Sequence, residues 1–139
     1  MGRPRRVQII ERRTAPVLDE RIAGVARAGK RLCRLDEIPD GDCRGFDPSG
    51  QGRDTVLVVR RGDSLHGWRD ACPHLGGAPM AWRKDAYLNA ARDRIVCNGH
   101  GALFDIATGI CTLGPCLGES LQPVAVVVDG EGFICLTVV

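Results

Sequence analysis

Two short segments, each with one cysteine and one histidine, constrain this chain more than any other feature of its sequence. They are Cys72-Pro73-His74 and Cys97-Asn98-Gly99-His100. Two thiolates and two imidazoles can hold a tetrahedral zinc ion. They can also hold a [2Fe–2S] cluster in which two cysteines bind one iron and two histidines bind the other. Either site requires the two segments to form neighbouring loops in the folded protein.

The order of the ligands favours iron over zinc. Zinc ribbons and fingers usually take pairs of like ligands from segments such as C-x2-C and H-x3–5-H. Here each segment supplies one cysteine and one histidine in the same order, as C-x-H and then C-x2-H. An asymmetric cluster needs this arrangement, because each loop must reach both irons. A zinc site remains the alternative.

The residues around the two segments are equally specific. They read Cys72-Pro-His-Leu-Gly-Gly77 and Cys97-Asn-Gly-His-Gly-Ala-Leu-Phe-Asp105, followed by Ala107-Thr-Gly109 and Gly114-Pro115. From about Lys30 to Val139 the chain closely resembles the Rieske family of iron–sulfur proteins, whose pattern is C-x-H in one loop and C-x2-H-G in the next.

The resemblance implies a ligand set for one [2Fe–2S] cluster per chain. Cys72 and Cys97 would bind the inner iron, and His74 and His100 would bind the outer iron, which takes the electron. The surroundings would be Leu75, Gly76, Gly77, Gly99, Gly101, Ala102, Phe104 and Pro115, the last in a third loop that covers the cluster. The positions of Ala102 and Phe104 hold a serine and a tyrosine in high-potential members. Without these hydroxyl donors we expect a potential of around −150 mV, near the low end of the Rieske range.

The chain departs from the family pattern in two respects, and the second indicates the branch of the family to which it is similar. The stretch between His74 and Cys97 is 22 residues long, more than is usual in small ferredoxin members, and an extra turn or strand extension around 80–92 would account for it. Members that work in respiratory complexes join their cluster loops by a disulfide. Gly77 and Gly99 stand where those cysteines would be, so the chain resembles the low-potential ferredoxin branch.

Short segments rich in β-branched or alternating apolar residues predict an all-β protein. Tight turns at 61–63 and 129–132 predict two hairpins. Together with the resemblance, they indicate an antiparallel sandwich or open barrel with a small cluster-binding subdomain at its tip. The seven expected strands are 32–35, 55–60, 64–69, 94–97, 103–106, 124–128 and 133–138.

Residues 1–29 lie outside the family pattern and form a basic N-terminal extension ahead of the expected Rieske domain at 30–139. Arginines occupy positions 3, 5, 6, 12 and 13, and residues 16–28 predict a helix with Leu18, Ile22 and Val25 on one face. We expect this helix to pack on the sandwich, with docking to an acidic partner subunit as the alternative. A net charge of only +2 and the lack of aromatic residues among the arginines argue against nucleic-acid binding.

The length of 139 residues suits one domain and leaves no room for a second, catalytic one. A Rieske oxygenase subunit would need a further iron site with two histidines and one carboxylate. His66 is the only other histidine, and we expect it to be an ordinary strand or turn residue. We therefore expect an electron-transfer component and not an enzyme.

No apolar run of 18 residues and no signal segment is present, so we expect a cytoplasmic protein without a membrane span.

The chain has seven cysteines, five more than the expected cluster uses. The remaining five are Cys33, Cys43, Cys111, Cys116 and Cys135. An odd number without a signal segment argues against a disulfide framework. Cys111 and Cys116 flank the proline loop, so they could lie near the cluster. We expect them to be packed core residues, with a redox-active pair as the alternative.

Three function classes follow from these features. The first is a ferredoxin that carries single electrons, from a flavin reductase to a terminal oxygenase. The second is a permanent small redox subunit of a larger oxidoreductase, and the third is a zinc-binding module without redox activity. For the first class we expect an uncharged tip around the histidine ligands where redox partners dock. The tip would consist of Leu75, Gly76, Gly101, Ala102, Leu113 and Pro115.

Overall fold

The computed structural model describes residues 27–73, 79–99 and 101–138, and over these residues the protein is an all-β, antiparallel fold. The strands are β1 Arg27–Arg34, β2 Cys43–Phe46, β3 Val56–Arg61, β4 Ser64–Arg69, β5 Arg94–Cys97, β6 Ala102–Asp105, β7 Cys111–Leu113, β8 Val126–Val128 and β9 Phe133–Val138. The one helix in these ranges is a short 3-10 helix, η1 Leu35–Glu37. No helix in the described part of the chain has the length and apolar character needed to cross a membrane.

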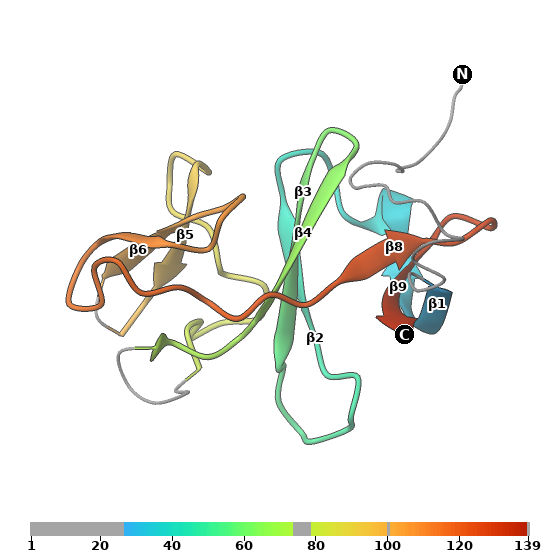
Figure 1. Cartoon of the computed structure of the whole chain (residues 1–139), viewed down its shortest axis with the longest axis horizontal. Helices are drawn as coiled ribbons and strands as arrows, with labels where there is room; N and C mark the ends of the chain where they lie inside the picture. Colours follow the sequence, from blue (N-terminus) through green and yellow to red (C-terminus); the bar gives the residue numbers. More distant parts are fainter. Residues whose placement is uncertain (1–26, 74–78, 100, 139) are drawn as a thin grey trace.

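The strands form three sheets of three, in the orders β1-β9-β8, β2-β3-β4 and β5-β6-β7. Figure 1 shows the β2-β3-β4 sheet in the middle of the molecule, with the other two on opposite sides. β3 is buried on both faces, as a strand in the middle of three layers must be. Val56 and Val58 pack in the core beneath β1 and β9, whereas Leu57 and Val59 pack in the core shared with β5 and β6.

Both predicted hairpins are confirmed. β3 and β4 pair antiparallel on either side of Gly62 and Asp63, and β8 and β9 pair on either side of residues 129–132. Gly62 has a φ of +63° and Gly132 a φ of +85°, backbone conformations that glycine adopts without steric cost. The two hairpins lie in different sheets.

The segment that follows β7 ties the middle sheet to the sheet of β8. Arg69 N donates to Gln122 O at 2.9 Å, and Val124 N donates to Gly67 O at 2.9 Å. Any side chain at Gly67 would clash with the carbonyl oxygen of Val124, so this close approach requires glycine. The chain thus returns from the β5-β6-β7 sheet along β4 before it enters β8.

The observed elements differ from the predicted ones at β1, β2, β7 and β8, and β8 begins at Val126, two residues after the start of the strand predicted at 124–128. β2 and β7 were not expected, and β1 begins at Arg27, five residues earlier than the predicted strand. Residues 16–26 of the predicted N-terminal helix lie outside the described residues, but its last two, Arg27 and Ala28, are in β1, so the helix cannot extend to Ala28. Pairing of Arg27 with Val138 and Ala28 with Thr137 on β9 outweighs the local helix signal there.

Candidate metal centre

Cys97 is positioned by the β5–β6 hairpin. It is the last residue of β5, pairs with Ala102 at the start of β6, and has a relative exposure of 1%. Gly101 N donates to Cys97 O at 2.8 Å and has a φ of +70°, which closes the turn. The loop between the strands therefore holds the cysteine inside the protein, while Gly99 and Gly101 are exposed.

Cys72 lies just after β4 and is fully buried, in the same apolar core as Cys97, Ala102 and Phe104. The structure therefore brings the two cysteines of the expected ligand set into one core, although they come from different sheets. Their partners His74 and His100 lie outside the described residues, as do Leu75, Gly76 and Gly77. Within the described ranges no group of three metal-ligating side chains is formed, so the complete ligand set stays a prediction.

The chemistry of the described part fits a [2Fe–2S] cluster. Two buried thiols in one apolar core are the donors that an inner iron requires. A side chain at Gly99 would meet no atom within 4 Å, so the backbone of this loop is open on its outer side. None of the seven cysteines, all of them described, forms a disulfide.

The third loop, residues 114–116, covers the β5–β6 turn. Gly114 has a φ of +115°, and a Cβ at this position would come within 2.8 Å of the Ala102 Cα atom. Ala102 is therefore buried under this loop, contrary to its expected place on the exposed tip, whereas Leu113 and Pro115 are exposed as expected. Cys116 follows the loop, is buried, and lies 3.3 Å from Cys111, Sγ to Sγ.

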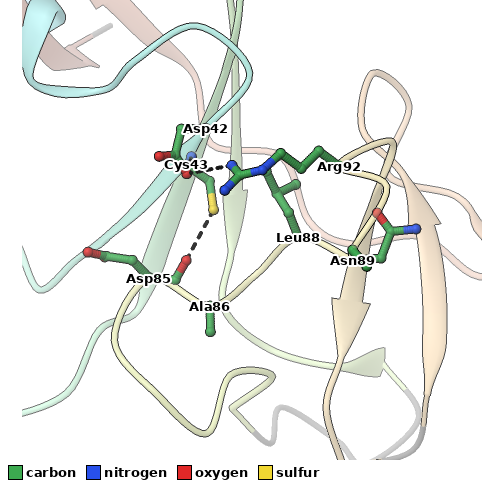
Figure 2. A pocket seen from close by; sticks show the side chains of 8 residues that line it. Asp42, Cys43, Asp85, Ala86, Leu88, Asn89 and Arg92 are labelled. Carbon is green, nitrogen blue, oxygen red and sulfur yellow. Dashed lines mark hydrogen bonds and ion pairs between the residues drawn. The ribbon is translucent and has the colours of Figure 1, made fainter.

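The long segment between the two cluster loops braces the site against β2. Asp85 O accepts a hydrogen bond from the Cys43 thiol at 3.2 Å, and Arg92 pairs with Asp42 at 3.2 Å (Figure 2). Between these contacts lies a hollow of about 270 Å³, lined in part by Leu88. Of the expected ligands in the described ranges, neither Cys72 nor Cys97 lines it. Burial raises the pKa of Cys43 to about 11, so this thiol stays protonated.

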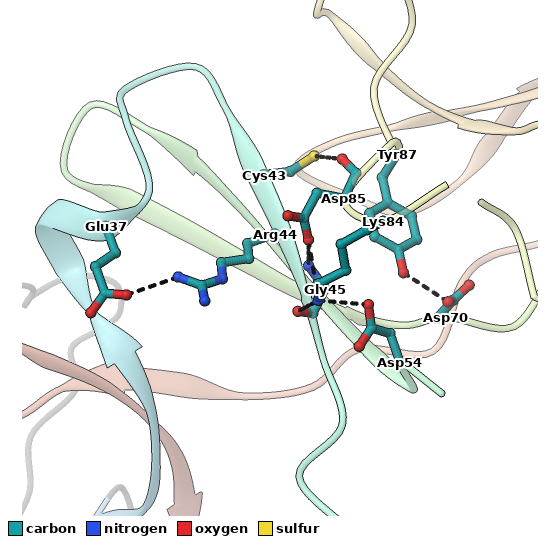
Figure 3. A network of polar contacts seen from close by, with 9 residues as sticks. All are labelled: Glu37, Cys43, Arg44, Gly45, Asp54, Asp70, Lys84, Asp85 and Tyr87. Atoms are coloured by element: carbon teal, nitrogen blue, oxygen red, sulfur yellow. Dashed lines mark hydrogen bonds and ion pairs between the residues drawn. The ribbon is translucent and has the colours of Figure 1, made fainter. Parts of the chain in front are cut away.

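A buried carboxyl group, missed by the sequence interpretation, supports the Cys72 loop (Figure 3). Asp70 is 5% exposed and is the one charged side chain that is buried in the described part of the chain. Its Oδ1 atom accepts from Met80 N at 2.8 Å and its Oδ2 atom from the Tyr87 hydroxyl at 2.8 Å. Burial, with the nearby Asp70, raises the pKa of Tyr87 above its usual range. No local pattern could have indicated this pair, because it joins residues 17 positions apart.

The same segment holds β2 and the second cluster loop. Asp85 Oδ1 accepts from Gly45 N at 2.8 Å, and Lys84 Nζ donates to Gly45 O at 2.7 Å (Figure 3). Asn98, next to Cys97, is bound through its backbone N to Met80 O at 2.8 Å. Residues 79–98 are thus connected to the middle sheet, to the Cys72 loop and to the Cys97 loop.

The large apolar side chains exposed on the described part of the molecule are all in its cluster subdomain, residues 70–121. They are Trp82, Ile110, Leu113 and Leu117. Leu113 is 59% exposed and Leu117 is 67% exposed, one on each side of the third loop.

His66, by contrast, is a half-buried residue of β4 paired with Val59, and burial lowers its pKa. It takes no part in the site.

Comparison with known proteins agrees with these features. The family model described as the Rieske [2Fe-2S] domain matches residues 29–130. The ferredoxin of carbazole 1,9a-dioxygenase from Nocardioides aromaticivorans IC177 is similar, with a TM-score of 0.60 and 32% identity over 80% of this chain and 97% of that chain. The Sphingomonas yanoikuyae B1 ferredoxin has a TM-score of 0.59 and 25% identity over 77% of this chain and 95% of that chain. No curated protein sequence matches in a direct comparison.

A third similar structure is a chain from the complex of reduced oxygenase and oxidized ferredoxin in carbazole 1,9a-dioxygenase. It has a TM-score of 0.59 and 26% identity over 77% of this chain and 90% of that chain.

Proposed function

Because the chain belongs to the Rieske [2Fe–2S] family, we propose that it is a ferredoxin that passes single electrons from a flavin reductase to a terminal oxygenase. Family membership implies one [2Fe–2S] cluster per chain and the role of an electron carrier. The observation that carries the finer proposal is the extent of the match. The chain covers 97% of a dioxygenase ferredoxin at 32% identity, so the likeness extends over nearly the whole of that carrier.

The proposed ligands are Cys72 and Cys97 for the inner iron and His74 and His100 for the outer iron. Burial of both cysteines in one core supports the first half of this assignment. When bound, the cluster supplies reversible one-electron chemistry. The protein's own residues bind it, keep water from its inner side and hold the two loops at a fixed separation. Asp70 and Asn98 hold the two loops through their hydrogen bonds to the backbone of Met80.

The surface of the cluster subdomain suits brief contact with redox partners. Two of its exposed apolar side chains, Leu113 and Leu117, flank the third loop, and small apolar patches are typical of transient protein contacts. We place the docking surface around Leu113 and Leu117.

Single substitutions of the four proposed ligands test the assignment. Cys72→Ser, His74→Ala, Cys97→Ser and His100→Ala should each abolish the cluster, because serine and alanine cannot replace a thiolate or an imidazole. The measurements are iron and acid-labile sulfide per chain and the visible absorption of the purified protein. Cys135→Ser is the matched control and should keep the cluster, since Cys135 is buried in the β1-β9-β8 sheet. Wild-type protein that holds one zinc ion and no sulfide would refute the assignment.

Electron transfer is tested separately. Mixed with a reduced flavin reductase of a dioxygenase system, the wild-type protein should accept one electron per chain, seen as bleaching of the cluster absorption. It should then return that electron to an oxidised terminal oxygenase. A loaded cluster that exchanges electrons with neither protein would contradict the proposed function and leave the ligand assignment intact.

A further inference from the structure

Two of the five cysteines outside the proposed ligand set lie in contact with each other. Cys111 begins β7 and Cys116 follows the third loop, and their Sγ atoms are 3.3 Å apart. A disulfide bond is about 2.05 Å long, so the sulfurs need to approach by only about 1.3 Å to form one. Among the remaining cysteines, Cys43 Sγ donates to Asp85 O and Cys135 Sγ to Phe133 O.

The backbone holds the two cysteines side by side. Cys111 N donates to Glu119 O at 2.7 Å, and Glu119 N donates to Cys116 O at 2.8 Å. Gly118 N also donates to Cys111 O at 3.1 Å. Both cysteines are thus bonded to the same short segment, and the contact between their sulfurs is a consequence of this local fold. Little conformational entropy remains to be lost when the ring closes.

We propose that Cys111 and Cys116 form a modification site: a dithiol that is oxidised reversibly to an intramolecular disulfide by hydroperoxides. One thiol sulfur attacks the peroxide, so that an S–O bond forms, the O–O bond breaks and an alcohol (water, for hydrogen peroxide) leaves. The second sulfur then attacks the sulfenic acid, the S–S bond forms and the S–O bond breaks with loss of water. Two thiols and one hydroperoxide give one disulfide, one alcohol and one water, with two electrons passed from sulfur to the peroxide.

The surroundings explain why the second sulfur matters. Both cysteines are 1% exposed, and burial with the hydrogen bond to Cys111 raises the pKa of Cys116 to about 12. Such a thiol reacts slowly compared with an exposed thiolate. Contact with a second sulfur traps the sulfenic acid as soon as it forms, before further oxidation. The residues that join the two cysteines, 112–115, are all exposed, so a small peroxide would approach the pair from this side.

The site adjoins the metal centre but does not depend on which residues bind the cluster. The loop between the cysteines packs on Ala102 through Gly114. A disulfide would therefore stiffen the cover of the β5–β6 turn. Cys111 and Cys116 belong to the same buried core as Cys72 and Cys97, so the experiment must distinguish this pair from disulfides that form when a cluster is lost.

Peptide mapping of the cluster-loaded protein makes that distinction. A protease that cleaves after Asp and Glu releases residues 106–119, which contain Cys111 and Cys116 and no other cysteine. After brief treatment with hydrogen peroxide, and alkylation of free thiols in denaturant, this peptide should carry no alkyl group and should be lighter by two hydrogens than the unmodified peptide. Dithiothreitol before alkylation should restore two alkyl groups. The cluster absorption should persist while the disulfide forms.

Matched variants complete the test. The Cys135→Ser variant should form the disulfide like the wild type. In the Cys116→Ser variant no disulfide can form between these positions, so Cys111 should still be alkylated. The proposal is overturned if the wild-type peptide keeps two alkylated cysteines, if it is oxidised in a form that dithiothreitol does not reverse, or if the disulfide appears only after the cluster absorption is lost. The wild-type arm decides the question even if Cys116→Ser fails to fold.

Discussion

At the scale of single residues, Ala102 and Phe104 are both fully buried on β6, where Ala102 pairs with Cys97 and Phe104 with Ile95 of β5. In high-potential members of the family, hydroxyl groups at these positions donate hydrogen bonds to the cluster. Such bonds stabilise the reduced, more negative cluster, and each charge-assisted bond is worth about 1.5–3 kcal/mol. We therefore expect Ala102→Ser and Phe104→Tyr each to raise the midpoint potential by about 60–130 mV, with roughly additive effects in the double variant.

Voltammetry of the wild type and the three variants checks this prediction. If the two side chains only fill space, the variants should alter thermal stability and leave the potential unchanged. Gly114 lies directly over Ala102, so a loss of stability in Ala102→Ser is expected in either case and does not count against the prediction. A wild-type potential well above zero would contradict it.

Tyr87 and Asp70 form the second residue-scale feature. Removal of the hydroxyl in Tyr87→Phe leaves the buried Asp70 Oδ2 atom without the 2.8 Å bond it accepts. A buried polar group that loses its partner costs about 1–3 kcal/mol, so the free energy of unfolding should fall by that amount. Denaturant titration followed by far-UV circular dichroism measures it. Thr112→Val, which removes an exposed hydroxyl from β7, should change stability by less than about 0.5 kcal/mol. Equal effects in the two variants would show that the Asp70 contact does not stabilise the fold.

At the scale of elements, residues 79–98 explain why the connection between the cluster loops is long. The sequence predicted an extra turn or strand around 80–92, and the structure shows turns with one isolated bridge, between Leu88 and Ile95 of β5. The contacts of the segment with β2 are hydrogen bonds from residues 84 and 85. Two residues of this segment, Asp85 and Arg92, have positive φ values of 64° and 60°. Such conformations are unfavourable for residues with a side chain, so the contacts of the segment must outweigh that cost.

Asp85 makes this balance testable. Asp85→Ala removes the acceptor for Gly45 N and leaves a non-glycine residue at positive φ, so we expect a loss of about 1–3 kcal/mol in unfolding free energy. Asp85→Asn keeps an acceptor and tolerates the conformation, and should stay within about 1 kcal/mol of the wild type. Asp85→Gly relieves the backbone but not the lost bond, and should fall between them. If alanine and asparagine are equivalent, the bond to Gly45 does not brace the segment.

At the scale of the whole molecule, the two hydrophobic cores lie between the three layers, and the large exposed apolar side chains of the described residues lie on one of these layers. The β1-β9-β8 and β2-β3-β4 sheets enclose one core, and the middle sheet and the cluster subdomain enclose the other. Large exposed apolar side chains among the described residues lie only on the cluster subdomain. We therefore expect redox partners to contact the cluster subdomain, at the opposite end of the molecule from the β1-β9-β8 sheet (Figure 1).

This division predicts where a charge will interfere with electron transfer. Leu113→Glu should weaken binding of the terminal oxygenase by about 1 kcal/mol or more, at least about fivefold, with the cluster absorption unchanged. Ser64→Glu, at the exposed β3–β4 hairpin of the middle sheet, should have no such effect. Stopped-flow rates as a function of oxygenase concentration measure both. If the two variants behave alike, the third loop is not part of the docking surface.

The sequence predicted the parts of the fold that have a local cause. Five of the seven expected strands begin and end within one residue of the observed ones, because alternating apolar residues and glycine turns act over a few positions. β2 was missed because its Arg44-Gly45 centre lacks a strand pattern. It is a strand because it pairs with β3 and because Gly45 forms hydrogen bonds with Lys84 and Asp85. β7, with three residues, is too short to show a pattern.

The sequence by itself determined the family and the proposed ligands, because cluster chemistry dictates which residue types must stand at which short spacing. Cys72 and Cys97 are buried in one core, and the assignment of all four ligands remains a prediction. Only the tertiary structure decided the support from Asp70 and Tyr87 and the contact between the Cys111 and Cys116 sulfurs. These depend on how separate strands and loops pack, and spacing along the chain does not specify distances across a core.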